Sequence, residues 1–286
     1  MNLHRLSLVF SAASLLLPAA GLLAQAPPPA EKAPAEKPAA ESNTKEGEYL
    51  RGWGETKDPA GDCKFQQKDG KLTITVPGSA TPHDLSTELK SSTAPRVGTD
   101  LSGDFDIQVK VEGEFEPGEQ STQAGRTGYT GAGLAVFADE KNYIRLERAT
   151  LQHSGSAPRP YANFEIRVDG ELERIGTTGD LPPIDISKPL WLRLTRSGDK
   201  MEGAISQDGT NWVTCEPKEL TNPAWRSRRI KGGVAAISTS VKDFTPSFSG
   251  FQAVKGVAPE KTEGKEKEKE KAEAAPEEKT APEKKP

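Results

Sequence analysis

Cysteine, histidine and aromatic residues are scarce in this chain. Its 286 residues include two cysteines and three histidines, 6% are aromatic, and 34% are hydrophobic. Such values are poor for a single core of this length but adequate for a smaller domain with polar ends. Neither sign of charge dominates, because 38 basic and 42 acidic residues give a net charge of −4. This balance argues against a nucleic-acid binder that relies on bulk charge.

Long hydrophobic runs are absent except at the N-terminus. There, a positively charged segment precedes an apolar run over residues 6–17, which Pro18 ends and small residues follow. The pattern predicts a signal peptide over residues 1–24. We expect cleavage after Ala24 rather than after Ala26, because a proline would directly follow the second site.

Export places the chain in the periplasm, the cell envelope or the medium, without membrane association after cleavage. The alternative is an uncleaved anchor, since residues 6–24 are nearly long enough to cross a bilayer.

Two segments are rich in alanine, proline, glutamate and lysine, namely residues 25–46 and 258–286. The first has the composition of an extended spacer, and the second includes a strict Lys/Glu alternation over residues 265–271. Both compositions predict disorder.

The remaining residues, 47–257, show alternation of apolar and polar side chains and no convincing amphipathic helix. The alternation is clearest over residues 72–76, 105–111, 164–168 and 190–194. Residues 133–138 are apolar at nearly every position, as expected of a central strand. Turn signals with Asp-Gly or Gly-Asp separate the runs. This pattern predicts an antiparallel β-sandwich or jelly roll.

Eight motifs follow one another through this domain: Gly52–Gly54, Asp58–Phe65, Gly103–Asp106, Tyr129–Leu134, Asn142–Arg148, Phe164–Gly170, Ser206–Trp212 and Phe244–Phe248. Together they resemble the concanavalin A-like bacterial family known as domain of unknown function 1349. The resemblance implies an all-β, concanavalin A-like jelly-roll sandwich over residues 47–257. It implies little about activity, because the superfamily includes lectins, glycosidases and plain spacers.

Metal-ligand spacing is lacking among the histidines and cysteines of the predicted mature chain, which are His83, His153, Cys63 and Cys215. We therefore predict no cofactor and no metal ligand. A structural calcium, which the superfamily often carries, is the alternative, and its ligands would be Asp58, Asp62 and Asp243.

The two cysteines, Cys63 and Cys215, would enter an oxidising compartment together. A bridge between them would close a long loop and could add roughly 4–5 kcal/mol in the chain-entropy model. The alternative is two buried thiols, because a disulfide also requires close Cα atoms.

Catalytic signatures are weak. No serine lies in a nucleophile elbow, and no strand carries the pair of glutamates that a retaining glycosidase of this superfamily would show. Gly128, Gly131 and Gly133 imitate a dinucleotide fingerprint, but no helix follows them, so close packing on a strand is expected. The sequence thus leans against an enzyme.

One set of polar side chains remains as a candidate site. Alternation places its members on one side of each of three predicted strands, with a further tyrosine at the border. If the strands are neighbours, the set forms one charged and aromatic face. The set is Tyr129, Tyr143, Arg145, Glu147, Asn163, Glu165, Arg167, Trp191 and Arg193.

We expect this face to be concave and to bind carbohydrate or another polar polymer, with a glycan or envelope polymer as the partner. One alternative is a glycoside-active enzyme that uses Glu147 and Glu165, although Arg145 and Arg167 would hold both carboxylates ionised. The other is a structural envelope domain whose face is an ordinary solvated surface with cross-strand ion pairs.

Overall fold

The computed structural model describes residues 46–256 apart from 79–80, 87–90, 176–180 and 228. The predicted signal peptide, the linker up to residue 45 and the tail 258–286 lie outside the described residues. Among the described residues, no helix is long and apolar enough to cross a bilayer.

Antiparallel pairing joins eight strands into a first sheet, called sheet A. In spatial order these are β1 (Tyr49–Leu50), β2 (Gly54–Lys57), β7 (Arg96–Leu101), β17 (Ile230–Ser238), β9 (Gly128–Phe137), β10 (Tyr143–Gln152), β11 (Arg159–Val168) and β12 (Glu171–Ile175).

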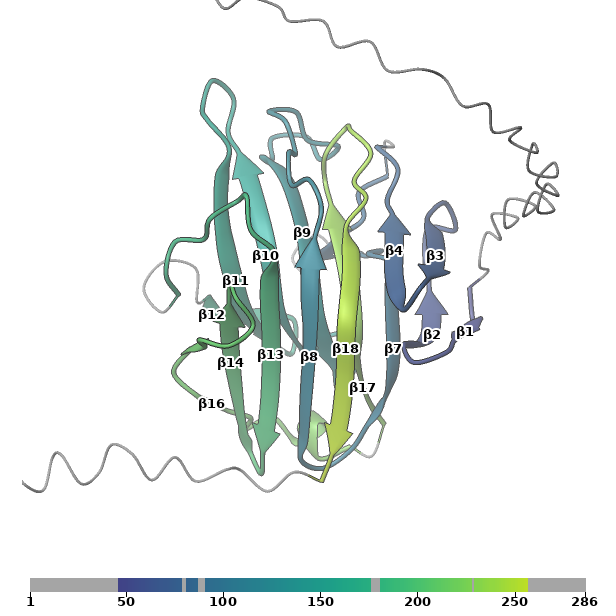
Figure 1. Ribbon diagram of the computed structural model, residues 1–286, viewed down its shortest axis with the longest axis vertical. Coiled ribbons are helices and arrows are strands. Elements are labelled where there is room, and N and C mark those ends of the chain that lie inside the picture. Colours follow the sequence, from purple (N-terminus) through teal and green to yellow (C-terminus); the bar gives the residue numbers. More distant parts are fainter. Residues whose placement is uncertain (1–45, 79–80, 87–90, 176–180, 228, 257–286) are drawn as a thin grey trace, which may run out of the picture. The chain divides into compact units, whose positions relative to one another are not determined.

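A second antiparallel sheet, called sheet B, packs against the first (Figure 1). Its order is β15 (Val213–Thr214), β14 (Lys200–Ser206), β13 (Leu190–Ser197), β8 (Phe105–Glu112), β18 (Ser247–Lys255), β4 (Lys71–Thr75) and β3 (Lys64–Lys68). The short strand β16 (Lys218–Glu219) also pairs with β14, and β5 (Leu85–Ser86) pairs with β6 (Ser91–Ser92) apart from both sheets. A single 3-10 turn, η1, spans Pro223–Arg226. The predicted all-β sandwich is confirmed.

The main core lies between the two sheets. Leu134, Leu146 and Phe164 of sheet A meet Val109 and Leu192 of sheet B in one cluster of buried side chains. Burial of each such side chain is worth about 1.5–3 kcal/mol. The period-2 alternation of the sequence supplies these residues, because every second side chain of a strand points to the same face.

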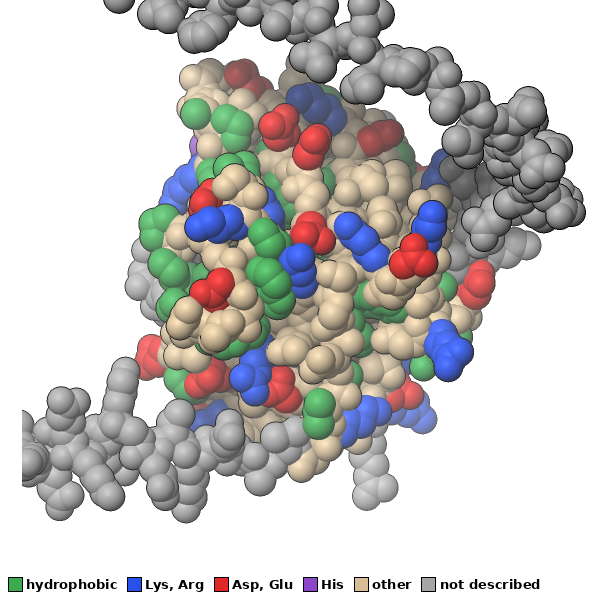
Figure 2. Space-filling model, in the orientation of Figure 1, with side chains coloured by type: hydrophobic (Ala, Val, Ile, Leu, Met, Phe, Trp, Pro, Cys, Tyr) green, Lys and Arg blue, Asp and Glu red, His purple; other side chains and the backbone are tan. Residues whose placement is uncertain are grey.

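The two sheets differ in what covers their other face. In β8 and β13 buried residues alternate with half-exposed ones, so the outer face of sheet B meets solvent. That face mixes acidic, basic and apolar side chains without a patch of one charge (Figure 2). Strands β9, β10 and β11 are instead buried on both faces over most of their length. The apolar stretch 133–138 lies largely in β9, between β17 and β10, as the predicted central strand should.

Two hairpins are closed by the predicted Asp-Gly turns. Asp69 and Gly70 have φ angles of 50° and 75°, and Asp169 and Gly170 have φ angles of 51° and 89°. Two successive positive φ values define the type I′ turn, which matches the twist of the strands it connects.

Substitution Gly70→Ala should therefore destabilise the domain by roughly 1–2 kcal/mol, which is the cost of a left-handed backbone for a residue with a Cβ. A Cβ at this position would have no heavy atom within 4 Å, so a steric clash would not contribute. Urea denaturation measures the effect. The neighbouring Lys68→Ala, a surface change, should stay within about 0.5 kcal/mol of wild type, and equal effects of the two substitutions would contradict the turn assignment.

The predicted disulfide is not formed, because Cys63 and Cys215 are both buried free thiols. Cys63 directly precedes β3, at one edge of sheet B, whereas the backbone N–H of Cys215 donates to Gly203 in β14, near the other edge. Five strand spacings between β14 and β3 amount to roughly 24 Å, and bridged Cα atoms lie within about 7 Å of each other. Sequence separation alone could not reveal this distance.

Titration of the denatured, unreduced protein should accordingly detect two free thiols per chain. If neither thiol reacts before reduction and both react after it, the two cysteines form a disulfide after all.

Candidate functional site

The candidate site lies on the face of sheet A that points away from the main core. Strands β10 and β11 are neighbours, and their register sets Arg145 opposite Glu165, Glu147 opposite Asn163, and Tyr143 opposite Arg167. The predicted merging of the polar sides of these two strands is thus confirmed. Tyr129 joins the group from β9, on the other side of β10.

Trp191 and Arg193 are not part of this group, so their expected place beside β10 and β11 is wrong. They belong to β13, which pairs with β8 and β14 in sheet B. There the Arg193 guanidinium donates to both carboxylate oxygens of Asp106, and the Lys110 ammonium lies 5.0 Å from the centre of the Trp191 ring. Alternation gives the side of a strand to which a residue points, but not the sheet to which the strand belongs.

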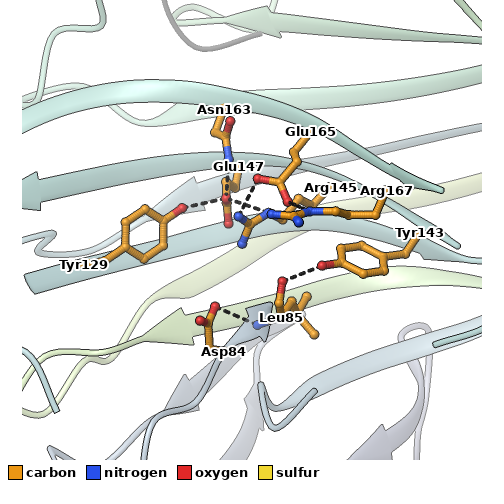
Figure 3. Close-up of polar contacts among 9 residues, drawn as sticks. All are labelled: Asp84, Leu85, Tyr129, Tyr143, Arg145, Glu147, Asn163, Glu165 and Arg167. Atoms are coloured by element: carbon orange, nitrogen blue, oxygen red, sulfur yellow. Dashed lines mark hydrogen bonds and ion pairs between the residues drawn. The ribbon is translucent and has the colours of Figure 1, made fainter. Parts of the chain in front are cut away.

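The polar groups of β9, β10 and β11 form one buried network (Figure 3). Glu147 Oε1 accepts hydrogen bonds from the Tyr129 hydroxyl at 2.6 Å and from Asn163 Nδ2 at 2.9 Å. Glu165 accepts one from Arg145 Nη2 at 2.6 Å and one from Arg167 Nε at 2.7 Å. Arg145 Nε also lies 3.4 Å from Glu147 Oε1, so that Arg145 connects the two carboxylates.

Burial of these charges is nearly complete. The side chains of Glu147, Glu165 and Arg145 are 2%, 5% and 11% exposed. Cross-strand pairs on a solvated surface would be far more accessible, and therefore the group is not an ordinary exposed face.

A glycine makes room for the network. A Cβ on Gly131 would lie 2.7 Å from both Glu147 Oε2 and the Tyr129 hydroxyl oxygen, and one on Gly133 would lie 2.2 Å from the Leu146 carbonyl oxygen. The glycines of this motif thus serve close packing on a strand, as predicted.

The two glutamates titrate differently. Burial raises the pKa of Glu147, against the charge of Arg145 and the hydrogen bonds from Tyr129 and Asn163. Burial would also raise the pKa of Glu165, but the charges and hydrogen bonds of Arg145 and Arg167 outweigh it and lower that pKa below its ordinary value. The difference follows from the contacts, because two guanidinium groups lie against Glu165 and one lies near Glu147.

A segment that precedes β7 covers part of this face. Leu85 packs against Tyr143, Ala135 and Ala235, and the Tyr143 hydroxyl donates to the Leu85 carbonyl oxygen (Figure 3). Tyr143 is thus buried and its hydroxyl is used within the fold. The alternation that revealed the strands carries no signal for this covering segment.

Beside the covering segment, the network opens into a cavity of about 530 Å³. Charged and polar side chains from several loops and strands line it, including Asp84, Gln123, Arg126, Tyr129, Arg145 and Arg167. The sequence reasoning missed Asp84, Gln123 and Arg126, since loop residues have no periodicity that indicates which way they point.

Two members of the network have unused hydrogen-bonding capacity. Arg145 Nη1 and Asn163 Oδ1 are buried without a hydrogen-bond partner among the described residues, and Arg145 Nε has only the 3.4 Å ion-pair contact with Glu147. Of these two residues, Arg145 lines the cavity and Asn163 does not.

A second cavity, of about 440 Å³, lies over β2, β7 and β17 of the same sheet. Several of its charged groups are engaged within the fold: Lys231 pairs with Glu55 at 2.7 Å, and Arg96 donates to the Ala94 carbonyl oxygen at 3.0 Å. The cavity at Arg145 is the better candidate for a polar ligand.

The three acids considered for calcium do not gather at one point. Asp243 accepts a hydrogen bond from the Gly78 backbone, as a turn acid usually does. Asp58 and Asp62 belong instead to the turn that carries Cys63.

No family model matches the chain, and no curated protein matches it. A functionally unknown protein from Saccharomyces cerevisiae has a similar structure, with 16% identity, a TM-score of 0.53, and coverage of 71% of this chain and 94% of that one. A xylan β-1,4-xylosidase from Bacillus halodurans C-125 is 16% identical, with a TM-score of 0.47 over 68% of this chain and 34% of that one. The carbohydrate-binding module CBM66 from Bacillus subtilis is 12% identical, with a TM-score of 0.36 over 72% of this chain and 99% of that one.

The likeness to the yeast protein supports the sandwich fold. The resemblance to the domain of unknown function 1349 family rests on the sequence motifs.

The buried network makes a pH-dependent prediction for Glu165→Gln. Removing one partner of a buried ion pair should cost about 3–5 kcal/mol at neutral pH. Because the pKa of Glu165 is lowered on folding from its ordinary value near 4.5, its stabilisation is present above that value and is lost as the pH falls through the folded-state pKa. Urea denaturation at a series of pH values should show the difference from wild type shrinking in acid.

A matched control is Glu55→Gln, which breaks a pair whose side chains are 51% and 52% exposed and should cost no more than about 1 kcal/mol. A cost for Glu165→Gln as small as that of the control would contradict the burial of the network.

Proposed function

We propose that this chain is an exported, non-catalytic module that binds carbohydrate or another polar polymer in the cavity at Arg145. The observation that carries the proposal is Arg145 Nη1, a buried donor that has no partner among the described residues and belongs to a residue lining a cavity of about 530 Å³. A buried donor without an acceptor is costly, so a ligand that supplies acceptors would be favoured there.

The chemistry of the lining suits a polyhydroxylated ligand. Arginine guanidinium groups present planar sets of N–H donors to hydroxyl or carboxylate oxygens, and Arg126, Arg145 and Arg167 all reach the cavity. Asp84 supplies acceptors for hydroxyl hydrogens. Tyr129 offers a half-buried ring, and aromatic rings commonly pack against the apolar faces of ligands. The volume falls within the usual range of small-molecule sites, roughly 300–1,000 Å³.

Glu147, Asn163 and Glu165 take a supporting role in this proposal. They do not line the cavity among the described residues, and their hydrogen bonds fix the side chains of Tyr129, Arg145 and Arg167. A ligand would meet a face held in place by the network beneath it, which reduces the entropy lost on binding.

A glycoside-active enzyme is the second candidate, favoured by the divergent pKa values of Glu147 and Glu165. A raised and a lowered carboxyl pKa are what a general acid and a nucleophile need. Both carboxylates, however, are almost fully buried and engaged by Tyr129, Asn163 and two arginines. They are therefore poorly placed to reach a scissile bond, and binding without turnover is the expected behaviour.

A glycan-array screen of the full chain tests the proposal, with substitutions chosen to preserve folding. Arg126→Ala changes an exposed residue of the cavity, and Arg145→Lys keeps the buried charge but removes the planar fork of donors. Loss of a hydrogen bond to a charged group should weaken binding by Arg145→Lys roughly 10- to 100-fold. Arg193→Ala is the control, because Arg193 lies in sheet B and should leave binding unchanged.

Each outcome distinguishes the candidates. Binding that both cavity substitutions weaken, without product release, supports the module. Product release that Glu147→Gln abolishes supports the enzyme instead. Two outcomes would contradict the proposal and favour a structural envelope domain. One is glycan binding that neither cavity substitution changes, and the other is a folded wild type that binds no glycan on the array.

A further inference from the structure

A second cluster of chemically active side chains lies away from the cavity, where the β2–β3 turn meets the segment before β5. His83 Nε2 is 2.6 Å from Asp62 Oδ1, and Cys63 Sγ is 3.6 Å from the same oxygen. One donor atom from each of these three residues lies within 4.8 Å of the others. Cys63 and His83 are 8% and 1% exposed, so two of the three groups are inside the protein.

Local backbone structure holds both sides of the cluster in place. The turn that bears Asp62 and Cys63 is closed by a hydrogen bond from the Gly61 N–H to the Asp58 carbonyl oxygen, and the Cys63 N–H donates to Asp58 Oδ2 at 2.9 Å. On the opposite side, His83 exchanges two backbone hydrogen bonds with Ser238, at 3.0 and 2.9 Å. The donor atoms of the cluster therefore come from two anchored segments that are about twenty residues apart in the sequence.

The carboxylate that anchors the Cys63 backbone has one oxygen without a partner. Asp58 is 5% exposed, and its Oδ1 atom is buried without a hydrogen-bond partner among the described residues. The other oxygen of the same carboxylate is fixed by the Cys63 backbone, which keeps Asp58 next to the thiol. A buried carboxylate oxygen without a hydrogen bond or a cation is unfavourable.

The Cys63 thiol lies beside two carboxylates, because its Sγ is 3.6 Å from Asp62 Oδ1 and its backbone N–H donates to Asp58 Oδ2. A divalent cation would stabilise a thiolate and both carboxylates together.

We propose that Asp62, Cys63 and His83 form a binding site for a zinc-class divalent metal ion. One sulfur, one imidazole nitrogen and one carboxylate oxygen make a mixed set that suits zinc, and Asp58 holds the Cys63 backbone from outside this set. Calcium is a poor fit, because it takes six to eight oxygen ligands. The calcium alternative on Asp58 and Asp62 is therefore replaced by a metal that accepts sulfur and nitrogen.

The observed spacing is close to what a tetrahedral ion requires. With metal–ligand distances of about 2.0–2.3 Å, neighbouring ligand atoms lie roughly 3.3–3.7 Å apart. The Cys63–Asp62 separation of 3.6 Å already fits, and the Asp62–His83 hydrogen bond of 2.6 Å would open by less than about 1 Å. The Asp62 side chain is 36% exposed, so the movement would take place partly in solvent. On binding, the Cys63 thiol loses its proton to solvent, and metal bonds replace the hydrogen bond between Asp62 and His83.

The test is metal binding by the full chain, using Zn²⁺ in calorimetry and Co²⁺ as a spectroscopic substitute. We expect one equivalent of metal and a thiolate-to-Co²⁺ charge-transfer band in the near ultraviolet. Cys63→Ser should abolish that band and weaken Zn²⁺ binding at least roughly tenfold, and Asp58→Asn should weaken Zn²⁺ binding by a similar factor. Cys215→Ser is the matched control, since Cys215 is the other buried free thiol and should not affect either measurement.

Three results would each overturn the proposal. The first is a folded wild type that does not bind Zn²⁺ stoichiometrically, and the second is a Co²⁺ complex that shows no thiolate band. The third is a thiolate band that is lost in Cys215→Ser but retained in Cys63→Ser. If Cys63→Ser fails to fold, the wild-type protein still decides: bound Zn²⁺ should protect Cys63 from alkylation, and an unprotected Cys63 would contradict the site.

Discussion

The burial of two glutamates and two arginines against one face of sheet A is the constraint on which the arrangement around the site depends. Each charge would be very costly if left alone in this position, so each must find partners nearby. Glu165 takes two guanidinium groups and Glu147 takes a hydroxyl and an amide. A shift of one residue in the pairing of β10 with β11 would turn Arg145 into the main core and Ile144 out of it, so both faces of the sheet specify the same register.

The segment that covers this face connects the two proposed sites. Asp84 lines the cavity, its neighbour His83 belongs to the thiol cluster, and Leu85 packs on Tyr143. A metal ion at the cluster would tie this segment to the β2–β3 turn in addition to its backbone bonds with Ser238. The cavity wall would then be ordered before a ligand arrives, which lowers the entropic cost of binding. Cavity and cluster are therefore connected by three consecutive residues.

Alternation in the sequence was sufficient to predict the strands, the Asp-Gly turns and which side of each strand is polar. It could not assign Trp191 and Arg193 to a sheet, because period-2 patterning is the same whichever neighbour a strand pairs with. It could not show that the polar side of β10 is buried either, since the covering residues around Leu85 lie in an irregular segment. The separation of Cys63 from Cys215 and the meeting of Cys63 with His83 also depend on strand order, which is a long-range property.

The proposed binding role depends on Arg145. In a network that serves stability alone, unused buried donors should be few, because each costs about 1–3 kcal/mol. Glu165 meets this expectation, with both oxygens occupied. Arg145 does not, since Nη2 is bonded whereas Nη1 has no partner among the described residues. The unused donor belongs to the residue that links the network to the cavity, so the unsatisfied capacity lies where a ligand could use it.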